Sequence, residues 1–206
     1  MKRTSLLGIV GLLFITLALN GCSTATPIVS EWRNPAPASG AFQRLMIGGP
    51  SGDVSMRRNF EDEFVAQLAA VGVDALASYR YVAENEATNE NNLKQAAQNA
   101  RADGLLLMRS VKVEEKTNYP MIGPEFSFGI FGSNVGAGWS GIPGASGPSR
   151  YNEYTSETAL YDLAKNDLVW TGTVKTTEPT NVQTAIKSYV QTITKALAAQ
   201  NLLAKK

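Results

Sequence analysis

The chain has 206 residues, with 19 basic and 18 acidic side chains and a formal net charge of +1 at pH 7. This near-neutral balance provides no basic surface of the kind that holds nucleic acid. The sequence contains no histidine and a single cysteine, which excludes Ser-His-Asp and Cys-His nucleophile systems, zinc sites of the Cys/His type and disulfides within the chain.

The first two dozen residues have the organisation of an export signal. Lys2 and Arg3 form a positive start, residues 6–19 form an apolar run, and the small residue Gly21 precedes Cys22. A transmembrane helix needs about 20 predominantly apolar residues, so this run is too short to span a bilayer. The pattern predicts a signal peptide over residues 1–21.

The end of this segment, Leu19-Asn20-Gly21-Cys22, resembles the lipobox of bacterial lipoproteins, with Asn20 departing from the usual Ala or Ser. The resemblance implies cleavage before Cys22 and acylation of that cysteine, with palmitate among the acyl groups. Ser23, rather than Asp, implies outer-membrane sorting in Gram-negative bacteria. Because two or more acyl chains give stable attachment, we expect a lipid-anchored protein facing the periplasm. An ordinary secretory signal with an incidental cysteine is the alternative.

The mature chain of about 185 residues has the length of one domain, with 17 basic and 18 acidic residues once Lys2 and Arg3 are removed. Residues 22–41 are rich in Pro, Ala, Ser and Thr and predict a lipidated N-terminus and flexible tether, with Trp32 as a first docking point. Residues 42–206 predict the folded domain.

Apolar periodicity and turn signals give the elements of this domain in chain order. A strand at 44–47 is followed by a helix over 56–71, with Ser55 as N-cap and Gly72 at its C′ position. A strand at 73–79 leads to a second helix that begins after Thr88 or Asn89 and ends near residue 102.

The second half predicts a strand at 105–116, a hairpin of strands 154–163 and 168–176, and a last helix from Asn181 to about residue 203. Leu168, Trp170 and Val174 are expected on one strand face. The order β-α-β-α-β-β-β-α predicts a single α/β domain with a mixed sheet of about five strands and two or three packed helices.

Local phrases suggest a relative. Residues 102–107, 160–162 and 168–172 (ADGLLL, LYD and LVWTG) resemble small Gram-negative lipoproteins of a family of unknown function. The layout is also similar to the α/β domain of the curli-secretion lipoprotein and to the N-terminal domain of the Tol-system translocation protein. This resemblance implies a fold and an envelope location, and it brings no catalytic residues.

The most unusual stretch is the insertion at 117–150, whose residues 117–149 hold eight glycines, four prolines and five aromatic residues, with Glu125 as the only charge. Uncharged loops of this length are uncommon inside a compact domain and are usually functional or disordered. Three interpretations compete: packing on its own domain, docking of a partner, another copy or the lipid headgroup region, or insertion into a membrane as part of a pore. The predicted contact residues are Tyr119, Phe126, Phe128, Ile130, Phe131 and Trp139.

Other polar and glycine-rich stretches have simpler explanations. Residues 48–53, with Arg57 and Arg58 after them, could cradle a phosphate, but a tight strand-to-helix turn explains the glycines. Neighbouring carboxylates of one helix or strand do not converge on one point, so we expect solvated faces for two acidic runs, at 61–63 and at 114–115. Trp170 and Tyr161 could stack on a carbohydrate, but core positions are favoured.

The sequence therefore predicts a non-enzymatic, lipid-anchored binding or assembly component of the bacterial envelope, with residues 119–142 as its interaction surface. No catalytic residues, cofactor or metal are expected. The expected partners are the membrane, through the lipid on Cys22, and a protein partner or a second copy. One alternative is an oligomeric secretion or pore-forming lipoprotein that inserts residues 119–142, and another is an envelope hydrolase that uses carboxylates alone.

Overall fold

A computed structural model describes residues 26–36, 38–49, 53–83, 89–118, 149–179 and 181–204. The six strands of this part of the chain are β1 (Ile28–Arg33), β2 (Arg44–Gly48), β3 (Asp74–Ala77), β4 (Gly104–Asn118), β5 (Ser149–Asp162) and β6 (Asp167–Thr177). The helices are α1 (Val54–Ala70), the short 3-10 helix η2 (Ser78–Arg80), α2 (Glu90–Asn99) and α3 (Val182–Ala199).

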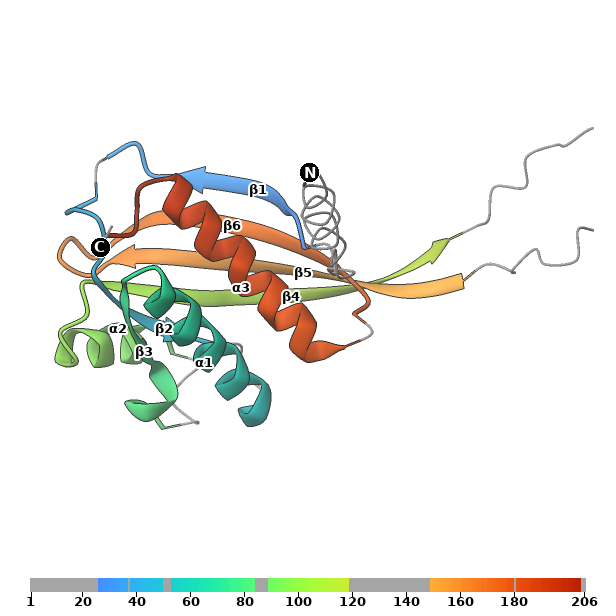
Figure 1. Ribbon diagram of the computed structural model, residues 1–206, viewed down its shortest axis with the longest axis horizontal. Coiled ribbons are helices and arrows are strands. Elements are labelled where there is room, and N and C mark those ends of the chain that lie inside the picture. Colours follow the sequence, from blue (N-terminus) through green and yellow to red (C-terminus); the bar gives the residue numbers. More distant parts are fainter. Residues whose placement is uncertain are drawn as a thin grey trace, which may run out of the picture.

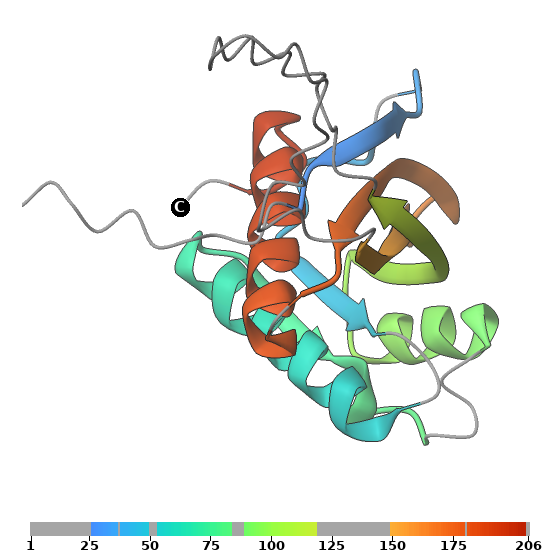
Figure 2. The same cartoon turned by 90° about the vertical axis from the view of Figure 1, so that its right-hand side faces the viewer.

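The strands form one mixed sheet in the order β1-β6-β5-β4-β2-β3 (Figure 1). β2 pairs in parallel with β3 and with β4, and the other neighbours are antiparallel. Helices α1 and α3 lie side by side on one face of the sheet, and α2 lies on the other (Figure 2). The predicted single α/β domain with a mixed sheet is confirmed.

Two hydrophobic clusters hold these layers together, one on each face of the sheet. The larger lies beneath α1 and α3, where the rings of Phe60 and Tyr189 meet with centroids 5.6 Å apart. The smaller lies beneath α2 and includes Leu93 and Ala97. Successive residues of β4 alternate between the clusters, with Leu105 and Leu107 toward α2 and Leu106 toward the other face. This alternation explains why the strand begins fully apolar.

Strand β1 is a correction to the sequence prediction, which placed residues 28–33 in a flexible tether. These residues pair antiparallel with β6, from Ile28 opposite Val174 to Arg33 opposite Trp170. Their side chains are mostly exposed, so they lack the buried apolar pattern by which a strand is usually recognised. Backbone pairing with an edge that was otherwise unpaired is what orders this segment.

The helices form where they were predicted, but α2 ends at Asn99 and α3 at Ala199, before the predicted ends near residues 102 and 203. Asp53, not Ser55, caps α1 and accepts a hydrogen bond from the Met56 amide at 2.8 Å. Asn89 and Asn181 cap α2 and α3 as expected. Gly72 has a φ of 91° just after α1, the left-handed conformation that a C′ glycine provides.

The β5–β6 hairpin forms as predicted, but Leu168 does not share a face with Trp170. The register shifts between Leu160, which pairs with Trp170, and Tyr161, which pairs with Leu168. The extra residue, Val169, reverses the phase of the strand. Leu168 therefore packs with the cluster beneath α2, while Trp170 and Val174 lie in the cluster beneath α1 and α3.

Strands β4 and β5 are the longest of the sheet and continue together beyond the other strands (Figure 1). Their pairing runs from Gly104 opposite Asp162 to Asn118 opposite Ser149, whereas the pairing of β5 with β6 begins only at Glu153. Residues 115–118 and 149–152 therefore form a two-stranded ribbon, which we call the arm.

Candidate functional site

The residues that the sequence predicts as functional, Cys22 and the six contact residues between Tyr119 and Trp139, lie outside the described residues. The predicted bounds of the insertion, 117–150, are too wide, because residues 117–118 belong to β4 and residues 149–150 to β5. From here on, the insertion means residues 119–148. Asn118 and Ser149 are paired at the tip of the arm. The insertion is therefore attached at the far end of a β-ribbon that projects from the domain (Figure 1).

The arm and its base carry charged side chains of both signs, next to the exposed Val113. Glu114 forms ion pairs with Lys112 and with Lys116, the latter at 2.7 Å, and Glu115 forms one with Arg150 at 3.3 Å. The hydrogen bonds from Lys112 and Lys116 lower the pKa of the Glu114 carboxyl to about 2. These charged groups are exposed or half-exposed, as expected for a solvated strand end.

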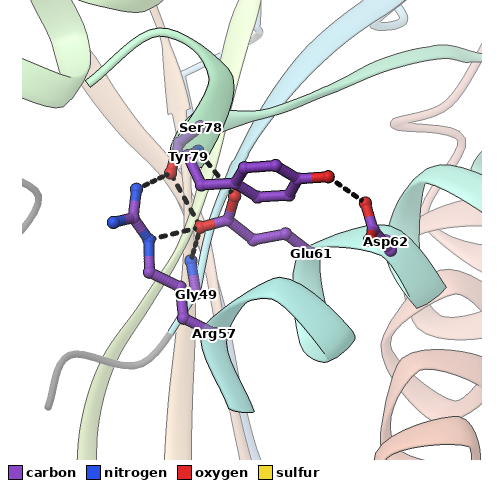
Figure 3. Close-up of polar contacts among 6 residues, drawn as sticks. All are labelled: Gly49, Arg57, Glu61, Asp62, Ser78 and Tyr79. Carbon is purple, nitrogen blue, oxygen red and sulfur yellow. Dashed lines mark hydrogen bonds and ion pairs between the residues drawn. The ribbon is translucent and has the colours of Figure 1, made fainter. Parts of the chain in front are cut away.

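A second polar cluster is buried at the carboxyl ends of β2 and β3 (Figure 3). Glu61 has no exposed surface, and its carboxylate accepts four hydrogen bonds. The donors to Oε1 are the Gly49 amide at 2.8 Å, Arg57 Nε at 2.9 Å and Ser78 Oγ at 2.7 Å. The Tyr79 amide donates to Oε2 at 3.0 Å. Arg57 is also buried and donates from Nη2 to Ser78 Oγ at 2.9 Å.

This Glu61 cluster joins three separate segments of the chain: the end of β2, the first half of α1 and the turn after β3. Gly49 suits the close approach, because a Cβ at this position would lie 3.0 Å from Cγ of Arg57 and 3.1 Å from its carbonyl oxygen, and these neighbours would have to shift slightly. A carboxylate with four donors is engaged as an acceptor and is not placed to move a proton to or from a substrate. The cluster therefore has a structural role, which is to hold these three segments together.

The expectation of a solvated 61–63 face is wrong for Glu61 and holds for Asp62, which is exposed and accepts a hydrogen bond from Tyr79 Oη. The sequence did contain one sign of this ion pair, because Arg57 and Glu61 are four residues apart on the same helix and side chains at this spacing can meet. The alternative that residues 48–53 cradle a phosphate is also weakened. Arg57, which could have bound the phosphate, donates its guanidinium hydrogen bonds to Glu61 and Ser78 instead. Residues 50–52 of that turn lie outside the described residues.

The two aromatic residues considered for carbohydrate stacking lie on opposite faces of the sheet. Trp170 is fully buried, and its Nε1 donates to Glu31 at 2.6 Å, so its predicted core position is confirmed. Tyr161 is buried beneath α2, where it donates to Glu90 at 2.7 Å and lies under the Lys94 ammonium, 4.2 Å from the ring centroid. Burial and the bond to Glu90 raise the pKa of Tyr161 to about 12. The two rings form no common platform.

The described ranges offer little for small-molecule chemistry. Among these residues no group of three or more Cys, Asp or Glu side chains is arranged to hold a metal ion. A pocket of about 350 Å³ lies between α2 and the residues after η2, and its lining carries no carboxylate or basic group. None of the helices in the described ranges has the length and apolarity needed to cross a membrane.

Comparisons with known proteins find only distant structural similarity. A scan against protein-family models finds no match, and a search of curated proteins finds none either. Among solved structures, the chain is similar to the PelC dodecamer from Paraburkholderia phytofirmans, with 13% identity over 88% of this chain and 100% of that one and a TM-score of 0.46. A dodecamer of a PelC point variant from the same organism gives 12% identity with the same coverage and TM-score.

Lipoprotein GNA1162 from Neisseria meningitidis is similar at 14% identity over 76% of this chain and 96% of that one, with a TM-score of 0.37. At these identities and TM-scores the likenesses assign neither a family nor an activity. The resemblance to particular lipoprotein families drawn from the sequence thus stays a prediction.

Proposed function

We propose that this protein is a non-enzymatic binding or assembly component of the bacterial envelope, anchored by acylated Cys22 to the periplasmic face of the outer membrane. Support for the anchor comes from the charged start, the short apolar run and the lipobox-like residues 19–22. Residues 119–142 are the proposed interaction surface.

One observation carries the proposed binding role, namely the attachment of the insertion at the tip of the arm, where Asn118 pairs with Ser149. If the insertion packed into the domain core, we would expect its two attachment points to lie close to that core. Here seven residues of β4 beyond Val111 and an equal length of β5 separate the insertion from the level at which β1 begins. This segment is rich in aromatic residues and has Glu125 as its only charge, a composition that fits a contact surface.

The buried polar groups support a non-enzymatic role. Arg57 and Glu61, the two buried charged side chains of α1, satisfy one another and their neighbours. A glycosidase needs two carboxyl groups about 5–10 Å apart across a substrate cleft, and Glu61 is already committed to four donors. We therefore propose that the protein binds a partner and does not catalyse a reaction.

The test is deletion of residues 119–142 in the native, lipidated protein, followed by cross-linking in intact cells. We expect the cross-linked partners to be lost while the urea unfolding midpoint of the domain stays unchanged. The matched control replaces Glu115 and Arg150 with Ala, which removes an ion pair of the arm and keeps the segment. Unchanged cross-links after the deletion would overturn the binding role.

A further inference from the structure

The chain that leaves the proposed anchor is fixed to the domain almost at once. Thr26 is buried, and its Oγ1 lies 2.6 Å from Ser188 Oγ and 3.4 Å from Thr192 Oγ1 of α3. The next carbonyl, that of Pro27, accepts a hydrogen bond from the Lys175 amide of β6 at 3.2 Å. The beginning of β1 is therefore held from both sides, by α3 and by the sheet.

The connection from Cys22 to Thr26 is too short to let the domain move away from the bilayer. Four residues span at most about 14 Å even when fully extended. Opposite edges of a six-stranded sheet are about 24 Å apart at the usual strand spacing. An acylated Cys22 therefore brings the β1 edge, and not the β3 edge, to the membrane surface.

This edge carries side chains that suit the boundary between water and lipid. Val29 and Trp32 are 50% and 45% exposed. Arg33 and Gln200 are hydrogen bonded, and Glu31 also reaches Gln200, so these two side chains of β1 turn toward α3. Trp32, between them in the strand, points to the opposite face. Tryptophan is enriched at the level of lipid headgroups, where one part of the ring system is wet and the other apolar.

We propose that β1, the edge strand on which Val29 and Trp32 are exposed, lies on the lipid headgroup region of the bilayer, so that a lipid surface is the partner of this strand. The inference rests on the proposed acylation of Cys22. Exposed strand edges are normally covered or protected by charge, and in the described ranges no element covers this side of β1, which lies at the border of the sheet (Figures 1 and 2). The hydrated headgroups would cover it.

The experiment uses the full, lipidated chain in vesicles of phosphatidylethanolamine and phosphatidylglycerol. A Val29→Cys variant is labelled with an environment-sensitive fluorophore, and Val71→Cys is the matched control. Val71 is 43% exposed and lies at the end of α1, next to β3 at the other edge of the sheet. The acylated thiol of Cys22 does not react, so each variant carries one label.

A nitroxide on the lipid headgroup should quench the label at position 29 at least three-fold more strongly than the label at position 71. Equal quenching, or stronger quenching at position 71, would overturn the proposal. So would a position-29 signal that rises with protein density at fixed lipid, because this would indicate pairing of β1 edges between two copies. Equal urea midpoints of the variants and the parent exclude an effect of misfolding.

Flotation and intact mass, measured on the same samples, separate the two claims. Vesicles that float with acylated protein but give equal quenching contradict only the orientation of β1. Protein that neither floats nor carries acyl chains contradicts the anchor itself, and with it both the proposed function and this inference.

Discussion

Glu61 shows how a single buried side chain can fix three segments of a chain. Its carboxylate accepts hydrogen bonds from the end of β2, from α1 and from the turn after β3, and the buried Arg57 supplies the compensating charge. A buried ion pair gives little net stability relative to apolar residues, but removing one partner leaves the other charged and unpaired. The role of Glu61 is therefore best measured by its removal.

We predict that Glu61→Gln lowers the free energy of unfolding by about 3–5 kcal/mol, because Arg57 keeps its charge and loses its buried counter-ion. The adjacent Asp62→Asn is the control, and as an exposed change it should stay within about 0.5 kcal/mol. Urea unfolding followed by circular dichroism measures both. A loss below about 1 kcal/mol for Glu61→Gln would show that the cluster does not lock the fold.

The Asp162 carboxyl makes the stability of the folded protein depend on pH in a direction that can be predicted. Burial acts to raise the pKa of this carboxyl, but hydrogen bonds from Ser39 and from the Lys165 and Ala164 amides outweigh it, so the pKa in the folded protein is lowered. A lowered folded pKa gives stability that is present above the unfolded value of 3.8 and is lost as the pH falls through the folded value.

We therefore predict that Asp162→Asn costs about 1.5–3 kcal/mol at pH 7, the range for hydrogen bonds to a charged group. The difference between this variant and the parent should shrink as the pH is lowered below 3.8. Urea midpoints at pH 7, 5 and 3 provide the measurement. If the difference in stability between the variant and the parent instead grew toward acid pH, the pKa of Asp162 would not be lowered in the folded protein.

At the scale of elements, most features with local signals were predicted, although the cap of α1 is Asp53 and not Ser55, and the features that depend on tertiary pairing were missed. The cap Asn181, the cap Asn89, which was predicted with Thr88 as the alternative, and the apolar start of β4 are local signals that the structure confirms. Strand β1 was missed because its side chains are exposed and only its backbone pairs. The phase of Leu168 was missed because a bulge at Val169 cannot be read from alternation. The buried role of Glu61 needed contacts with residues 12 to 18 positions away in the chain.

The arm is an element whose removal should leave the domain intact. Residues 115–118 pair only with 149–152 in the described sheet, outside both hydrophobic clusters. We predict that replacing residues 116–151 with Asn-Gly, a turn suited to a two-residue hairpin, changes the free energy of unfolding by less than about 1 kcal/mol. Differential scanning calorimetry of both proteins tests this, and a loss of several kcal/mol would show that the arm or its insertion packs on the domain.

At the scale of the whole molecule, the proposed anchor and the proposed interaction segment are attached to different strands of one sheet. The N-terminal chain joins at β1, and the insertion joins at the tip of β4 and β5. Because the register relates Ile28 to Val174, Ser156 and Val111 across four strands, β4 and β5 continue about 23 Å beyond that level at a strand rise of about 3.3 Å per residue. This is longer than the roughly 14 Å connection to Cys22, so an anchored protein can present the insertion at or along the bilayer surface.

The central claim is that Cys22 carries the lipid that attaches this protein to the envelope. Native mass spectrometry of the protein extracted in detergent tests it most directly. We predict a mature chain that begins at Cys22 and carries acyl groups, measured as single protomers or as a complex with a partner, whereas a closed multimer of fixed number would favour the secretion-pore alternative. A chain that retains residues 1–21, or that is processed elsewhere without added lipid, would contradict the account.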